Sequence, residues 1–78
     1  MGDWEDAEEL DEVLLAELRH ARLDFEDGRR ERRSRTSSEL AGLIGAPARH
    51  VMARLVALRV AGHVFEDRLR DRWTIELA

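Results

Sequence analysis

The sequence predicts a mainly α-helical fold with a small β hairpin, on three observations. Apolar residues recur at three- and four-residue spacing in the first third of the chain and again in residues 48–62, which is the periodicity of amphipathic helices. Between these segments, Gly45 and Pro47 mark a tight turn. After Gly62, the segments "HVFED" and "RWTIEL" have the composition of short strands, joined by the charged loop "DRLRD".

Length and composition limit the chain to one domain, residues 1–78. A chain of 78 residues buries only about 60% of the surface that its unfolded form exposes. It has no cysteine, which excludes a disulfide framework and a thiolate metal site. Stability must therefore come from packing or from a second copy of the chain. We expect residues 1–7 to form a flexible acidic N-terminus and residues 29–35 a basic connector.

No apolar run approaches the roughly 18 residues of a membrane span, and "MGDWEDAEEL" is acidic where a secretory signal is basic, so we expect a cytoplasmic protein without membrane contact. Acidic and basic residues are distributed unevenly along the chain. Residues 1–27 hold eleven acidic residues and two arginines, whereas residues 28–78 hold eleven arginines and six acidic residues. This asymmetry is typical of a nucleic-acid-binding part joined to an acidic helix, although solvated helix faces explain the charges about equally well.

The first predicted helix runs from about Asp6 to Glu26. Asp6, followed by Glu9, resembles a capping box, and Asp27-Gly28 supplies the stop. Its apolar face consists of Leu10, Val13, Leu14, Leu18, Ala21 and Phe25.

The connector "RRERRSR" has no apolar anchor and predicts a loop or a short edge strand. Thr36 and Glu39 then fit a capping box, which predicts a short helix over roughly Ser37 to Ile44. Gly45 ends that helix, and Pro47 fits the first turn of the next. In this third helix Val51, Leu55 and Leu58 share the inward face. In the last strand, Trp73, Ile75 and Leu77 share one face.

This order of elements resembles the winged helix-turn-helix domain of small prokaryotic transcriptional regulators of the ArsR-like and MarR-like kinds. The resemblance is carried by "TSSELAGLIGAPARHVMARLVALRVAGHVFED" and "RWTIEL", with Ala41 at the small position where the two helices cross and Gly45 in the turn. It covers about residues 36–77. It implies three helices plus a two- or three-stranded antiparallel wing.

The resemblance also implies a transcriptional regulator that binds double-stranded DNA, with the third helix in the major groove. Arg49 is the best candidate for a bidentate contact to guanine. Ser37 and Ser38 lie where helix amides can hold a phosphate. The candidate DNA-binding residues are Arg35, Ser37, Ser38, Arg49, His50, Ala53, Arg54, Arg68, Arg70 and Arg72.

Regulators of this kind commonly pair through helices outside the reading head, so we expect a homodimer formed by the first helix. Its candidate interface residues are Leu10, Leu14, Leu15 and Leu18. Trp4 or Leu23 could extend the same face.

Two other functions compete with DNA binding. Met52, Val56 and Val60 form an apolar stripe on the outer side of the third helix, which would suit a protein-protein interaction module. RNA or ribosome association through the arginine segments is weaker, because no aromatic stacking platform accompanies them. An enzyme is not expected: His20, His50 and His63 lack metal-ligand spacing, and we assign no catalytic residue, metal or cofactor.

Overall fold

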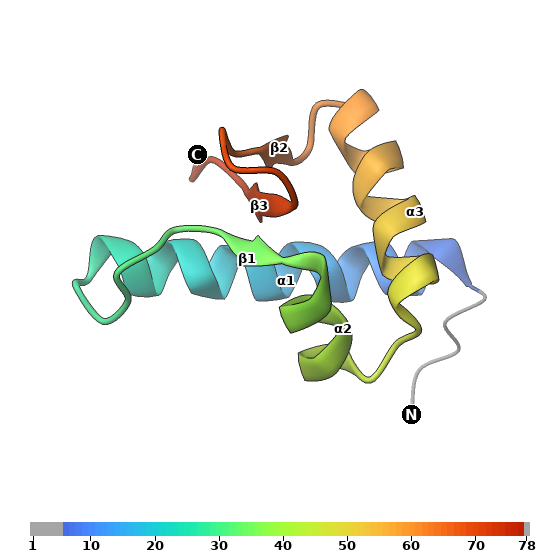
Figure 1. Ribbon diagram of the computed structural model, residues 1–78, viewed down its shortest axis with the longest axis horizontal. Coiled ribbons are helices and arrows are strands. Elements are labelled where there is room, and N and C mark those ends of the chain that lie inside the picture. Colours follow the sequence, from blue (N-terminus) through green and yellow to red (C-terminus); the bar gives the residue numbers. More distant parts are fainter. Residues whose placement is uncertain (1–5, 78) are drawn as a thin grey trace.

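The computed structural model describes residues 6–77, which fold into three helices and a small sheet (Figure 1). The helices are α1 (Ala7–Glu26), α2 (Ser37–Ile44) and α3 (Ala48–Val60). The strands β1 (Arg35–Thr36), β2 (Phe65–Glu66) and β3 (Arg72–Thr74) pair antiparallel in the order β1-β3-β2. The predicted fold class, mainly α with a small β wing, is confirmed, and the arrangement is compatible with a winged helix.

Helix α1 runs along the length of the molecule, and α2, α3 and β3 pack on it (Figure 1). Its N-cap is Asp6, whose carboxylate accepts hydrogen bonds from the backbone N–H of Glu8 and of Glu9. Asp27 caps the other end, and Gly28 follows with φ 77°. Residues 6 and 7, expected in the flexible N-terminus, therefore belong to α1 and its cap. The rest of that segment, residues 1–5 with Trp4, lies outside the described residues.

The helix-turn-helix forms for local reasons. Thr36 and Glu39 make both bonds of the capping box, with Glu39 N donating to Thr36 Oγ1 over 3.1 Å and Thr36 N donating to Glu39 Oε1 over 3.3 Å. Gly45 takes the left-handed conformation, φ 78°, and its N–H donates to Ala41 O. Pro47 is the N-cap of α3, one residue before the position expected for it, and is extended at ψ 135°.

The core lies where α1, α3 and β3 meet. The predicted inward stripe of α3 is confirmed, since Val51 and Leu55 are fully buried and Leu58 is 5% exposed. Because β3 is the central strand, Thr74 is buried along with Trp73 and Ile75, whereas Leu77 is only half-buried. The buried apolar cluster comprises Leu10, Leu14, Leu18, Leu40, Ala46, Val51, Leu55, Leu58, Val64, Trp73 and Ile75.

The expectation that the leucines of α1 form a dimer interface is wrong for Leu10, Leu14 and Leu18. Leu10, Leu14 and Leu18 have no exposed surface, because their face of α1 is the one that covers the core of the same chain. They cannot contact a second copy without opening the domain. Of the four candidate interface residues, Leu15 alone is half-buried and reaches the surface.

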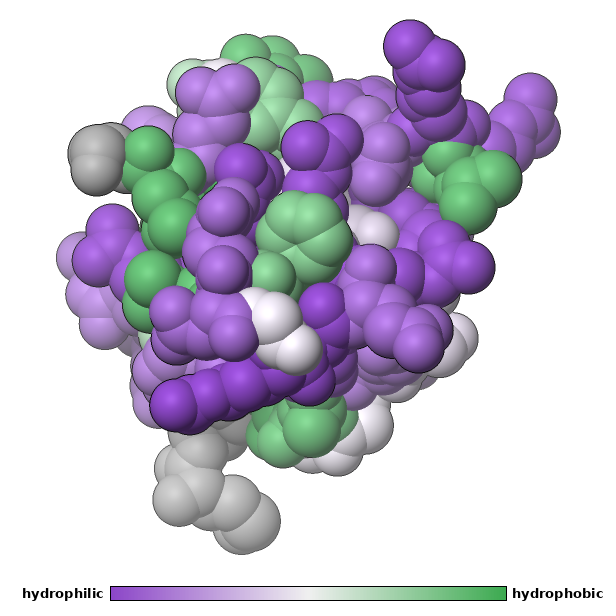
Figure 2. Space-filling view, turned by 90° about the vertical axis from the view of Figure 1, so that its left-hand side faces the viewer, coloured by the Kyte–Doolittle hydropathy of each residue, from purple (hydrophilic) through white to green (hydrophobic). Residues whose placement is uncertain are grey.

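The surface is dominated by polar side chains. Figure 2 views the end of the molecule that carries the C-terminal end of α1, and hydrophobic groups on this face stand apart among hydrophilic ones. None of the helices within residues 6–77 is long and apolar enough to cross a membrane.

Replacing Leu14 with alanine should lower the free energy of unfolding by about 2–5 kcal/mol, because the vacated volume lies in a closed core. Urea denaturation followed by circular dichroism measures this. Val60→Ala is the matched control: Val60 is 81% exposed, so its effect should stay within about 0.5 kcal/mol. A Leu14→Ala variant that kept its stability and only changed its state of association would contradict the core assignment.

Candidate nucleic-acid interface

The outer surface of α3 carries two exposed arginines, Arg49 and Arg59, and Arg59 pairs with Glu66 at 2.7 Å. Arg49 and Ala53 are exposed, and Met52 is half-buried against the core. The Arg49 side chain makes no hydrogen bond or ion pair with any residue in the range 6–77. It is therefore available to a ligand at the N-terminal end of α3, where a recognition helix meets the major groove.

His50, the neighbour of Arg49, is less available than expected. It is half-buried, and its Nδ1 atom is buried without a hydrogen-bond partner among the described residues. A buried ring nitrogen cannot reach a base edge, so any contact would have to come from the rest of the ring.

Arg54 does not have the free side chain that the DNA-binding assignment required. Its Nε and Nη2 atoms donate to the two carboxylate oxygens of Asp11, over 2.8 and 2.9 Å. This bidentate hydrogen bond raises the pKa of Arg54 and ties α3 to α1. Both side chains are partly exposed, so the pair is worth only about 1 kcal/mol or less. The guanidinium of Arg54 is nevertheless engaged within the fold.

The N-terminus of α2 is not an open phosphate site either. Ser37 is 7% exposed, and its N–H and hydroxyl donate to the carboxylate of Asp71, over 3.2 and 2.8 Å. The first amide of the helix thus already donates to an anion that belongs to the protein, and the Glu39 N–H donates to Thr36 Oγ1. Of the two serines expected to hold a phosphate, Ser38 alone is exposed.

Asp71 was not expected to be a site residue, yet it joins three parts of the fold. It adopts φ 60°, a left-handed conformation that Asp tolerates better than most residues, and its N–H donates to Glu66 Oε2. Its Oδ1 also accepts from Trp73 Nε1 over 3.0 Å. Because Ser37 is 34 positions away in sequence, no local pattern could have identified its contact with Asp71.

The environment of Asp71 favours its charged form. Desolvation by burial raises its pKa, but the hydrogen bonds from Trp73 and Ser37 and the nearby charge of Arg72 outweigh it. The pKa therefore lies below the ordinary value of 3.8. The wing, defined here as β2, β3 and the loop of residues 67–71, is thus held against α2 by a carboxylate that stays ionised at neutral pH.

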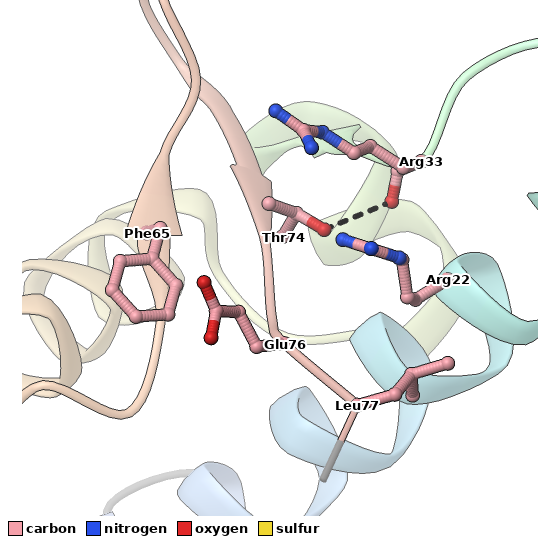
Figure 3. A pocket seen from close by; sticks show the side chains of 6 residues that line it. All are labelled: Arg22, Arg33, Phe65, Thr74, Glu76 and Leu77. Carbon is pink, nitrogen blue, oxygen red and sulfur yellow. Dashed lines mark hydrogen bonds between the residues drawn. The ribbon is translucent and has the colours of Figure 1, made fainter.

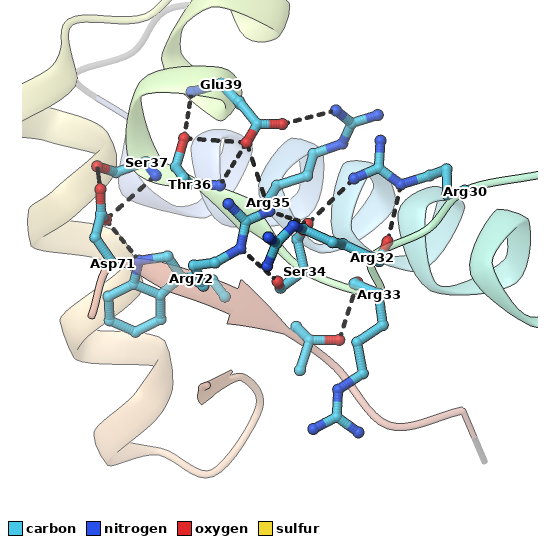
Figure 4. A network of polar contacts seen from close by, with 12 residues as sticks. Arg30, Arg32, Arg33, Ser34, Arg35, Thr36, Ser37, Glu39, Asp71 and Arg72 are labelled. Carbon is cyan, nitrogen blue, oxygen red and sulfur yellow. Dashed lines mark hydrogen bonds and ion pairs between the residues drawn. The ribbon is translucent and has the colours of Figure 1, made fainter. Parts of the chain in front are cut away.

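Arg35 and Arg72 also serve the fold, in the polar network of Figure 4. Arg72 donates from Nε to Ser34 Oγ over 2.9 Å and from Nη2 to Ser34 O over 3.0 Å. Arg35 donates from Nη1 to Glu39 over 3.4 Å, and its Nε is buried without a partner. Both side chains are more than four-fifths buried, so neither extends outward as the free guanidinium expected of a DNA contact does, although the Nη1 atom of Arg72 makes no hydrogen bond within residues 6–77.

The loop at the tip of the wing retains two free arginines. Arg68 and Arg70 are exposed, and their guanidinium groups make no hydrogen bond or ion pair with residues 6–77. Leu69 between them is 58% exposed. Asp67 is engaged instead: its carboxylate accepts from Arg68 N and pairs with Arg33 at 3.6 Å, and both contacts lower its pKa.

The expected DNA-binding residues thus divide into two groups. In the first, Arg35, Ser37, Arg54 and Arg72 hold elements of the fold together. The second is accessible and consists of Ser38, Arg49, Ala53, Arg68 and Arg70, with His50 partly accessible.

A cleft of about 300 Å³ lies between α1 and the sheet (Figure 3). Arg22 and Glu76 line it from either side, but Arg22 is already paired with Glu26 and donates to Ile75 O. Thr74 Oγ1 donates to the backbone oxygen of Arg33 at its edge. Within the described residues, no three His, Asp or Glu side chains gather in a way that could hold a metal ion.

No family model matches the chain, and comparison with curated proteins and with solved structures also finds no match.

Replacing Asp71 with alanine should lower the free energy of unfolding by about 1–3 kcal/mol, because the buried Trp73 Nε1 and Ser37 groups lose their acceptor. The folded-state pKa of Asp71 lies below its unfolded value. Its contribution is therefore present above the ordinary pKa of 3.8 and is lost as the pH falls through the folded-state pKa. Urea titrations at neutral and acidic pH measure the difference.

Glu12→Gln is the control, since Glu12 is exposed on α1 and makes no hydrogen bond or ion pair within residues 6–77. Its stability should match that of the unmodified protein. A destabilisation by Asp71→Ala that persisted unchanged at a pH well below 3.8 would show that the charge of Asp71 is not what holds the wing.

Proposed function

We propose that the protein binds double-stranded DNA through α3 and the wing and regulates transcription by occupying an operator. The observation that carries this proposal is that Arg49, at the start of α3, and Arg68 and Arg70, at the tip of the wing, are exposed and their guanidinium groups have no partner among residues 6–77. Other arginines of the same region are tied into the fold. Unpaired arginines at these two places are what a winged helix uses to contact DNA. The resemblance to ArsR-like and MarR-like regulators supports the same function.

In this proposal the phosphate backbone supplies most of the affinity. The outer face of α3 offers Arg49 for a guanine and Ala53 for a thymine methyl group, which gives little direct base readout. Arg68 and Arg70 add contacts to phosphates or to the minor groove. We therefore expect modest sequence preference and strong dependence on salt.

A duplex titration followed by fluorescence anisotropy should show the logarithm of affinity falling by about 0.9 per neutralised phosphate for each log unit of salt. Arg68→Ala should reduce that slope by about 1. Arg49→Ala should remove the preference for the best sequence, which we expect to be worth about 1–3 kcal/mol.

Arg19→Ala is the matched control, because Arg19 is an exposed arginine of α1 that makes no ion pair within residues 6–77. It changes the net charge equally and should leave DNA binding as it was. The proposal fails if no duplex binds at low salt, or if Arg19→Ala weakens binding as much as Arg49→Ala does.

A protein-binding winged helix is the second candidate, supported by the exposed apolar side chains of the same helices. Val56 and Val60 on α3 are 38% and 81% exposed, and Leu43 on α2 is 55% exposed. Val60→Glu would block a protein partner and leave phosphate contacts intact. If the protein acts by binding DNA, Arg49→Ala should abolish its regulatory activity in cells. If it acts by binding a protein partner, Val60→Glu should abolish it.

We also propose that the protein is a homodimer. Because Leu10, Leu14 and Leu18 are buried, its interface would be the outer edge of α1. Leu15 is half-buried and Leu23 is 42% exposed, and a shallow hollow of about 360 Å³ lies beside Leu15. Light scattering should give the mass of two chains, and Leu23→Glu should give the mass of one while retaining stability, because Leu23 is exposed and lies outside the core cluster. Leu43→Glu on α2 is the control and should remain dimeric. A monomeric mass at every concentration would reject the dimer.

A further inference from the structure

A hollow of about 380 Å³ lies where the connector passes α2 and β3, and arginines supply most of its lining. It is separate from the outer face of α3 and from the wing tip. Its lining residues are Arg30, Glu31, Arg32, Glu39 and Arg72.

Two guanidinium groups meet at a single backbone oxygen in this hollow. Arg30 Nη2 and Arg72 Nη2 both donate to Ser34 O, over 3.1 and 3.0 Å. Arg30 Nε is fixed by Arg32 O, and Arg72 Nε by Ser34 Oγ. Ser34 is 2% exposed, so the point at which the two cations converge is anchored in the fold. Figure 4 shows these side chains gathered around Ser34.

The positive charge in the hollow is not balanced. Glu39 is shared between Arg35, at 3.4 Å, and Arg72, at 3.7 Å. Arg30 and Arg32 pair with no carboxylate within residues 6–77, and Glu31, the remaining acidic residue of the lining, is exposed. Like charges held this close repel each other, and an anion between them would remove the repulsion.

The hollow also retains unused donors. The Nη1 atoms of Arg30 and Arg72 make no hydrogen bond within the described residues, and neither does any nitrogen of the Arg32 side chain. Guanidinium groups bind the oxygens of a phosphate with matching geometry and with charge-assisted hydrogen bonds.

We propose that this hollow is a binding site for a phosphate group, held by Arg30, Arg32 and Arg72. The site does not depend on the proposed function. The identity of the bound phosphate does depend on it: if the protein binds DNA, the site takes a backbone phosphate of the duplex. The alternative is the phosphate group of a free phosphate ion or of a nucleotide. In the complex with DNA, the connector would then provide the phosphate contact that the N-terminus of α2, occupied by Asp71, does not provide.

The test is a titration of the ¹⁵N-labelled protein with inorganic phosphate, against chloride at matched ionic strength, followed through the arginine Nε–H signals. The signals of Arg30, Arg32 and Arg72 should shift and saturate, while that of Arg19 stays in place. Arg32→Ala should weaken phosphate binding by about tenfold, the loss expected for one charge-assisted contact, with the melting temperature unchanged because its guanidinium makes no hydrogen bond or ion pair within residues 6–77. Glu31→Gln should strengthen it.

Shifts that grow without saturation, or that appear equally at Arg19, would overturn the site. So would an Arg32→Ala variant with unchanged phosphate affinity.

Duplex DNA distinguishes the two sources. If Arg32→Ala lowers both phosphate affinity and the salt slope for duplex by about 1, the site takes a DNA phosphate. If it lowers phosphate affinity and leaves duplex binding unchanged, the DNA source is overturned and the site takes a free phosphate. A protein that binds phosphate in the hollow and binds no duplex at all refutes the proposed function while the site itself stands.

Discussion

The carboxylate of Asp71 is the contact on which the arrangement of wing and helices depends. It lies between the N-terminus of α2 and the indole of Trp73, and Trp73 belongs to the core. One charged group therefore fixes the wing relative to the helix-turn-helix. It does so from a loop residue with φ 60°, a conformation that costs most side chains about 1–2 kcal/mol. The hydrogen bonds from Ser37 and Trp73 offset that cost.

The same contact determines where an external anion can bind. For a phosphate to occupy the N-terminus of α2, it would have to displace Asp71, which would leave Trp73 Nε1 without an acceptor and place two anions side by side. Losing the acceptor for a buried donor costs about 1–3 kcal/mol before the repulsion between the anions is counted. At the hollow lined by Arg30, Arg32 and Arg72 nothing needs to be displaced. The carboxylate of Asp71 thus occupies the anion site at the N-terminus of α2, whereas the hollow lined by Arg30, Arg32 and Arg72 keeps its positive charge.

The local elements of the fold could be predicted from the sequence because each depends on residues close together in the chain. The capping box of Thr36 and Glu39, the left-handed Gly45 and the inward stripe of α3 are of this kind. The candidate site was predicted less well, because its outcome depends on contacts between distant residues. Arg54 meets Asp11 across 43 positions, and Arg72 meets Ser34 across 38. Composition shows that arginines are abundant, but it cannot show which of them are engaged within the fold.

The partners of the α1 leucines could not be predicted from the sequence either. An amphipathic stripe has the same spacing whether it covers the core of its own chain or the helix of a partner, so Leu10, Leu14 and Leu18 could be assigned to either. In a chain this short the monomer core takes precedence, because the leucines of α1 close the core over α3 and β3. What remains for partners is the periphery: the edge of α1, the outer face of α3, the tip of the wing and the arginines of the connector. Arg49 on α3, Arg68 and Arg70 at the wing tip and the arginines of the connector are cations at this periphery, which favours an anionic ligand at these three places.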